Sequence, residues 1–124
     1  MPKVFTSKSQ KKGELGEDLA CRFLMKHGYY IVERNYTRRL GEIDIIAEKY
    51  GVIHFIEVKS VSFYATIRPE ENMHPMKLKK IYRTIEVYIQ ERGIKDKDWQ
   101  LDLVCVLLDE VGKRAKFRVI ENIV

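Results

Sequence analysis

Residues 41–59 read GEIDIIAEKYGVIHFIEVK, and this stretch decides the fold that we predict. It is rich in β-branched and aromatic residues on both sides of one turn signal, Tyr50-Gly51, a pattern typical of two strands joined as a tight hairpin. If these two residues form the loop, Lys49 faces Val52 across the hairpin.

Four charged residues then fall into register near the open end of the hairpin. Counting back from the loop places Asp44 directly opposite Glu57, and Glu42 opposite Lys59. A four-residue loop keeps the same pairing. A three-residue loop with a bulge would instead put Asp44 and Glu57 on opposite faces of the sheet.

Two adjacent carboxylates repel each other unless a positive group lies between them, so this register predicts a divalent metal site. Mg²⁺ is held by one or two carboxylates together with water and phosphate oxygens. The alternative is an ordinary solvated hairpin face. However, Glu57 lies within VIHFIEVKS, where apolar residues occupy both faces, and such strands are usually covered on both sides. A carboxylate buried there is costly unless it is paired or metal-bound.

The same residues carry a family resemblance. Asp44 followed by Glu57-Val58-Lys59 is similar to the signature of the PD-(D/E)xK nucleases. More narrowly, the chain resembles the bacterial YraN family of predicted endonucleases, which are similar to archaeal Holliday-junction resolvases. The matching fragments run in order along most of the chain: Gly13-x-x-Gly16-Glu17, Gly28-Tyr29, Arg34-Asn35-Tyr36, GEIDIIA from Gly41, FIEVK from Phe55, and Pro75-x-Lys77.

This resemblance implies a restriction-endonuclease-like α/β fold and a Mg²⁺- or Mn²⁺-dependent nuclease acting on DNA, including branched or non-duplex forms. It implies that Asp44 and Glu57 bind metal, that Lys59 positions the attacking water, and that Glu17 completes the acidic set. By analogy it also implies a homodimer that cuts two strands. The chain departs from the family at Val61, where an arginine is common, and in the following loop, which lacks the usual glycine.

The N-terminal part contains a basic segment and a helix. Residues 1–12 hold four lysines without a periodic pattern and are expected to form a flexible arm, with a single domain over residues 13–124. From Gly13 to the stop signal at Gly28 the apolar spacing is helical. Glu17 shares the face of apolar neighbours and is expected to point into the domain; a carboxylate that merely favours the helix start is the alternative.

Downstream patterns complete the predicted order α-β-β-β-α-β-β. Residues 29–36 favour a strand before the hairpin, and a helix from Pro75 to Gly93 follows a long irregular stretch over residues 60–75. Residues 99–108 favour a central strand and residues 115–120 a final one. We therefore predict a three-layer domain with a mixed central sheet flanked by helices.

Basic side chains close to the hairpin are candidates for contact with phosphate. Planar guanidinium groups suit phosphate oxygens, and cations at a helix start oppose the helix dipole, which weakens a purely structural interpretation of them. A solvated basic surface remains the alternative. The candidate nucleic-acid ligands are Arg34, Arg38, Arg39, Lys77 and Lys80.

Composition narrows the class of protein but does not fix its function. The net charge of +5 mildly favours a polyanionic partner, and the absence of a long apolar run favours a cytoplasmic protein without a membrane segment. Two alternatives to a DNA nuclease stay open: a nucleic-acid-binding protein that keeps the fold without cleaving, and an enzyme acting on RNA or nucleotides.

Overall fold

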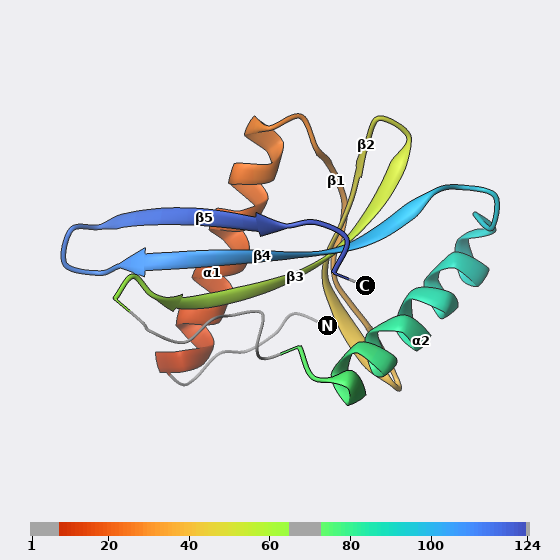
Figure 1. The fold of residues 1–124 in the computed structure, drawn as a ribbon, viewed down its shortest axis with the longest axis horizontal. Coiled ribbons are helices and arrows are strands. Elements are labelled where there is room, and N and C mark those ends of the chain that lie inside the picture. Colours follow the sequence, from red (N-terminus) through yellow and green to blue (C-terminus); the bar gives the residue numbers. More distant parts are fainter. Residues whose placement is uncertain (1–7, 65–72, 124) are drawn as a thin grey trace.

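The computed structural model describes residues 8–64 and 73–123, which form two helices and five strands (Figure 1). Their order confirms the predicted α-β-β-β-α-β-β arrangement. The elements are α1 (Lys8–Lys26), β1 (Tyr30–Arg38), β2 (Gly41–Lys49), β3 (Val52–Ser62), α2 (Pro75–Arg92), β4 (Trp99–Asp109) and β5 (Arg114–Ile120).

The strands form one mixed sheet in the order β1-β2-β3-β4-β5. β3 and β4 are parallel, and the other neighbouring pairs are antiparallel. Parallel neighbours require a crossover connection, and α2 lies in that connection.

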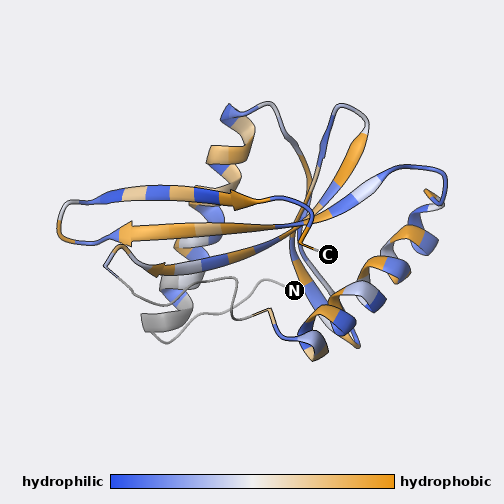
Figure 2. Cartoon of the chain, in the orientation of Figure 1, coloured by the Kyte–Doolittle hydropathy of each residue, from blue (hydrophilic) through white to orange (hydrophobic). Residues whose placement is uncertain are grey.

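The helices cover opposite faces of the sheet, which makes the predicted three layers. On one face, Ala20 and Leu24 of α1 pack in a core with Ile45 and Val104. On the other face, residues of α2 such as Ile85 pack in a second core with side chains of β1–β4. Figure 2 shows β5 alternating between hydrophilic and hydrophobic residues, the pattern of an edge strand that is covered on one side.

The hairpin register agrees with the prediction from the turn. Tyr50 and Gly51 have φ values of 51° and 77°, as a two-residue type I′ turn requires, and Lys49 pairs with Val52. The ladder between β2 and β3 then continues to the pair Ile45 and Ile56.

Two boundaries differ from the sequence-based expectation. α1 begins at Lys8, so residues 8–12 extend the helix; the rest of the expected arm, residues 1–7, lies outside the described residues. β3 continues to Ser62 because it keeps pairing with β4, whereas an irregular stretch was expected from residue 60. Within the described part of the chain, neither helix is long and apolar enough to cross a membrane.

Candidate functional site

The site lies where the sheet divides. The ladder between β2 and β3 ends at Ile45 and Ile56, but β1 and β2 stay paired to Gly41, and β3 and β4 stay paired to Ser62. Figure 1 shows β1 and β2 turning away from β3, β4 and β5 beyond this point. We call this division of the sheet the fork.

Asp44 and Glu57 are the next residues after the last pair of this ladder, and each accepts a hydrogen bond from the opposite strand. The Val58 N–H donates to Asp44 Oδ2 at 2.8 Å, and the Asp44 N–H donates to the Glu57 carboxylate. Side chains therefore replace the missing ladder bonds, and these bonds hold both carboxylates at the fork.

α1 brings Glu17 to the same place. A Cβ atom on Gly16 would lie 1.7 Å from Ser60 Oγ, so glycine at this position lets α1 approach β3 closely. Oxygen atoms of Glu17, Glu42 and Asp44 all lie within 4.8 Å of one another. Two elements, α1 and β2, thus contribute three carboxylates to one small volume, here called the acidic cluster.

Glu57 lies beside the acidic cluster in an environment that disfavours its charge. It is 8% exposed, and its Oε1 atom has no hydrogen-bond partner among the described residues. Burial, followed by the negative charge of Asp44, raises the pKa of Glu57 to about 9, while the positive charge of Lys77 opposes the rise. A cation beside Glu57 would favour its charged form.

These residues suit a hard divalent cation. Carboxylate oxygens are the ligands that Mg²⁺ and Mn²⁺ prefer, and the buried Oε1 atom of Glu57 offers a further one. The set that the structure brings closest includes Glu42, which sequence reasoning placed in register without assigning it. Its place two residues before Asp44 was the available signal. A metal-binding role for Glu57 stays a prediction.

Comparison with known proteins shows which family the chain belongs to. A model of the uncharacterised protein family UPF0102 matches residues 16–106, a range that includes all the acidic residues of the fork. The chain belongs to the UPF0102 family. This confirms the YraN family assignment made from the motifs.

Relatives of this UPF0102 protein match along most of their length. A UPF0102 protein of Campylobacter jejuni strain 81-176 is 44% identical over 104 residues, covering 84% of this chain and 90% of its own. One of Helicobacter pylori strain G27 is 40% identical over 121 residues, covering 98% and 97%. One of Persephonella marina is 40% identical over 100 residues, covering 81% and 86%.

The predicted phosphate ligands of this UPF0102 protein do not form one group. Arg34 is paired with Asp18 on α1 at 2.8 Å, whereas Arg38 is paired with Glu91 on α2 at 2.8 Å, so the two guanidinium groups contact helices on opposite faces. The left-handed φ of 54° at Asn35 interrupts the alternation of side chains between them.

The remaining site residues lie on β3, on α2 or in the turn after β1. Lys59 is half-buried and follows Glu57 by two residues on β3, so the two share a face of the strand. Lys77 is exposed in the first turn of α2, close enough to act on the charge of Glu57. Arg39 and Lys80 are exposed as well. Phosphate binding by these residues stays a prediction.

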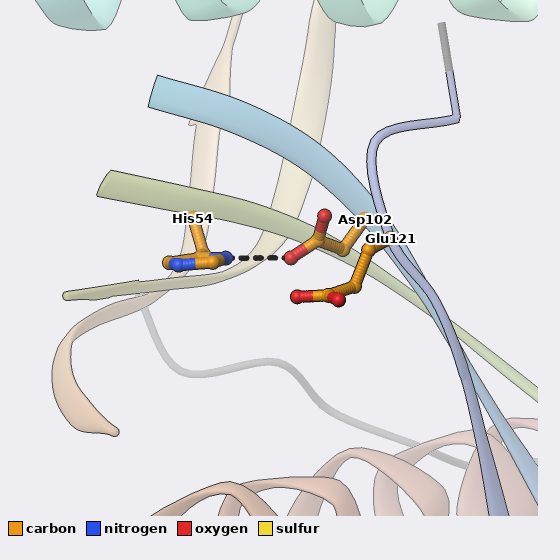
Figure 3. A group of neighbouring side chains, drawn as sticks. All are labelled: His54, Asp102 and Glu121. Carbon is orange, nitrogen blue, oxygen red and sulfur yellow. Dashed lines mark hydrogen bonds and ion pairs between the residues drawn. The ribbon is translucent and has the colours of Figure 1, made fainter. Parts of the chain in front are cut away.

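A second group of titratable residues lies at the other end of β3, and sequence reasoning did not assign it. Figure 3 shows His54, Asp102 and Glu121 together, with the His54 Nδ1 atom 2.7 Å from Asp102 Oδ2. Asp102 Oδ1 also accepts bonds from the Gln100 side chain and the Asn122 N–H. The Asn122 bond fastens the segment after β5 to β4, and the His54 contact joins β3 to β4, so the buried His–Asp pair has a structural role.

Proposed function

We propose that this UPF0102 protein is a metal-dependent endonuclease that hydrolyses phosphodiester bonds in DNA. The observation that carries the proposal is that carboxylate oxygens of Glu17, Glu42 and Asp44 lie within 4.8 Å of one another. They lie next to Glu57, whose charged form is disfavoured by burial and by the charge of Asp44. A protein that only bound DNA would gain nothing from several carboxylates that repel phosphate. The match to the motif of PD-(D/E)xK nucleases supports the same reaction.

The residues of the chain have distinct roles in this proposal. Glu17, Glu42, Asp44 and Glu57 form the set from which the metal ligands come, and the Val58 N–H keeps the Asp44 carboxylate oriented. Bound Mg²⁺ would supply Lewis-acid polarisation of a phosphate oxygen and a more acidic attacking water. The Lys59 ammonium would orient that water and stabilise negative charge on the phosphate, and Lys77 would offset the surplus of negative charge at the fork.

Cleavage of labelled DNA tests the proposal. Single-stranded, duplex and four-way-junction substrates are incubated with Mg²⁺ or Mn²⁺, and EDTA provides the metal-free control. We expect metal-dependent products from the wild type and a loss of roughly 100-fold or more in rate for Asp44→Asn, Glu57→Gln and Lys59→Ala. Lys95→Ala, an exposed lysine in the connection between α2 and β4, is the matched control and should cut normally.

Two results would count against the proposal that this site is the active site of a nuclease. Equal cutting by all three site variants would assign the activity to another site or to a contaminant. If the wild type binds DNA but releases no product from any substrate with either metal, the protein is a non-cleaving nucleic-acid-binding protein.

A further inference from the structure

We propose that the sheet face carrying Glu57 and Lys59 extends across β4 onto β5 as a binding surface for an unpaired DNA strand. This inference deepens the proposed function and rests on it, because it names the form of the DNA that the site would receive. The surface consists of Lys59, Lys116, Arg118, Phe63 and Tyr64, and we call it the β3–β5 track.

The register of the strands aligns the basic residues of the track. In the parallel ladder Lys59 is level with Cys105, and in the antiparallel ladder Cys105 is level with Arg118. One step further along the same face, Val61 is level with Leu107, and Leu107 with Lys116. Neighbouring strands lie about 4.8 Å apart, so Arg118 lies about 10 Å across the sheet from Lys59.

Packing shows that these side chains point away from α1. Phe117, between Lys116 and Arg118, stacks on Phe23 of α1 with ring centroids 4.5 Å apart. Because side chains alternate along a strand, Lys116 and Arg118 point to the opposite face. Both are exposed. In Figure 1, α1 lies behind this part of β4 and β5, and α2 lies at the other end of the sheet, so no helix that the structure describes covers the face of Lys116 and Arg118.

Aromatic residues complete the track where β3 ends. The Lys116 Nζ atom lies 4.7 Å from the centroid of the Phe63 ring, and this ring meets that of Tyr64 edge to face at 5.4 Å. Tyr64 is 73% exposed and offers a ring face to solvent. Basic residues that follow the backbone, together with rings on which bases stack, are the usual features of single-strand binding surfaces.

The dimensions of the track suit a single strand. Alternate residues of a β-strand are about 6.6–6.8 Å apart, close to the separation of successive phosphates in an extended strand. From Lys59 to Phe63 the track runs about 13 Å, enough for about two nucleotides. Stacking on Tyr64 requires a base that is not paired, because a duplex keeps its bases within its own stack.

Arg34 and Arg38, which were predicted from the sequence to bind phosphate, are poorer candidates than the residues of the track for contact with a DNA strand. Arg34 and Arg38 are each held by a carboxylate, whereas Lys116 contacts only an aromatic ring among its described interactions. Lys116 and Arg118 also lie outside residues 16–106, so the family match does not assign them.

Fluorescence anisotropy in EDTA tests the track without requiring cleavage. The probes are a blunt 20-base-pair DNA duplex and the same duplex with a ten-nucleotide single-stranded tail. We expect the wild type to prefer the tailed DNA, and Lys116→Glu/Arg118→Glu to weaken its binding about 10-fold or more while lowering the salt dependence. Tyr64→Leu should weaken binding of the tailed probe by about 5-fold and leave blunt duplex binding unchanged.

Lys95→Glu/Lys97→Glu makes the same change in charge in the connection between α2 and β4, far from β5, and should change binding of the tailed probe less than 2-fold.

If the Lys116/Arg118 variant binds the tailed probe as this control does, the track is wrong. Equal loss for blunt and tailed DNA, or no binding of either by the wild type, would also overturn it. If the Lys116/Arg118 variant cleaves normally and its binding is unaltered, the track is rejected and the proposed nuclease activity stands. Loss of tail binding in a protein that never cleaves would support the track and reject the nuclease.

Discussion

Glu57 illustrates the conflict between stability and function in single residues of this site. A carboxylate in this position loses most of its hydration and lies near the negative charge of Asp44. Without a metal, its charged form is unfavourable, and one of its oxygens lacks a hydrogen-bond partner within the described part of the chain. Residues that reduce the stability of a fold in this way are often retained for a functional reason.

Glu57→Gln should therefore make the metal-free protein more stable at neutral pH, because an amide keeps the shape and does not ionise, whereas Glu57 must take up a proton on folding when its pKa rises to about 9. We expect the free energy of unfolding in EDTA to rise by about 1–3 kcal/mol. The same variant should lose the stabilisation that the wild type gains from Mn²⁺. Thermal unfolding with and without Mn²⁺ measures both effects, and Glu110→Gln, an exposed carboxylate on another segment, is the control. If Glu57→Gln is less stable than the wild type in EDTA, the Glu57 carboxylate does not destabilise the metal-free fold as inferred here.

Glu91 is the opposite case, a carboxylate stabilised by its partners. Hydrogen bonds from Arg38, and to a lesser extent from Tyr36, lower its pKa from 4.5 to about 2. The lowered pKa means that the charged form contributes stability above about pH 4.5 and that this contribution is lost as the pH falls toward 2. Glu91→Gln should lower the unfolding temperature at pH 7 and match the wild type near pH 2. Glu86→Gln, on an exposed position of the same helix, should show no such convergence.

At the scale of elements, the site depends on how closely α1 approaches β3. Gly16 permits this approach, and Glu17, the next residue, reaches the acidic cluster because of it. Sequence periodicity revealed the helix and the inward face of Glu17. It could not reveal the contact with Ser60, because that contact depends on the distance between two packed elements.

Gly16→Ala should therefore destabilise the protein, although alanine favours helices. We expect a loss of about 1–3 kcal/mol from overpacking against Ser60, together with weaker Mn²⁺ binding. Gly13→Ala is the matched control, because a Cβ there meets nothing within 4 Å, and it should be neutral or stabilising. Ser60→Gly should restore part of the loss in the Gly16→Ala background. No difference between the two alanine variants in chemical denaturation would contradict the close contact.

The hairpin was predictable because its turn fixes its register. Tyr50-Gly51 is the one turn signal between the two strands, and taking these residues as the loop pairs Lys49 with Val52, as the structure does; the rest of the ladder follows from this pair. The acidic cluster was only partly predictable. The spacing of two residues between Glu42 and Asp44 was visible in the sequence, but the end of the ladder at Ile45, which depends on how the sheet twists and divides, was not. The contacts of Arg34 and Arg38 with helices on opposite faces were not visible in the sequence either, because the left-handed φ of Asn35 breaks the alternation of side chains between them.

At the scale of the whole molecule, the distribution of charge matters more than its sum. The net charge of +5 is modest, but Glu17, Glu42, Asp44 and Glu57 gather at the fork, and basic residues lie on the adjoining β3–β5 track and at the start of α2. DNA that binds along this surface would meet repulsion where the metal is needed and attraction elsewhere. The homodimer implied by the family resemblance stays a prediction.

Removing one carboxylate of the acidic cluster should therefore strengthen DNA binding when no metal is present. In EDTA we expect Asp44→Asn to bind tailed DNA about 2- to 5-fold more tightly than the wild type, since one less negative charge faces the phosphates. Asp96→Asn changes the net charge equally but lies in the connection between α2 and β4, so it should have a smaller effect. Anisotropy titrations at two salt concentrations measure the difference, which should shrink at high salt because screening shortens the range of the repulsion. If Asp44→Asn and Asp96→Asn tightened binding equally, only the total charge would matter, and the DNA backbone would not pass the fork.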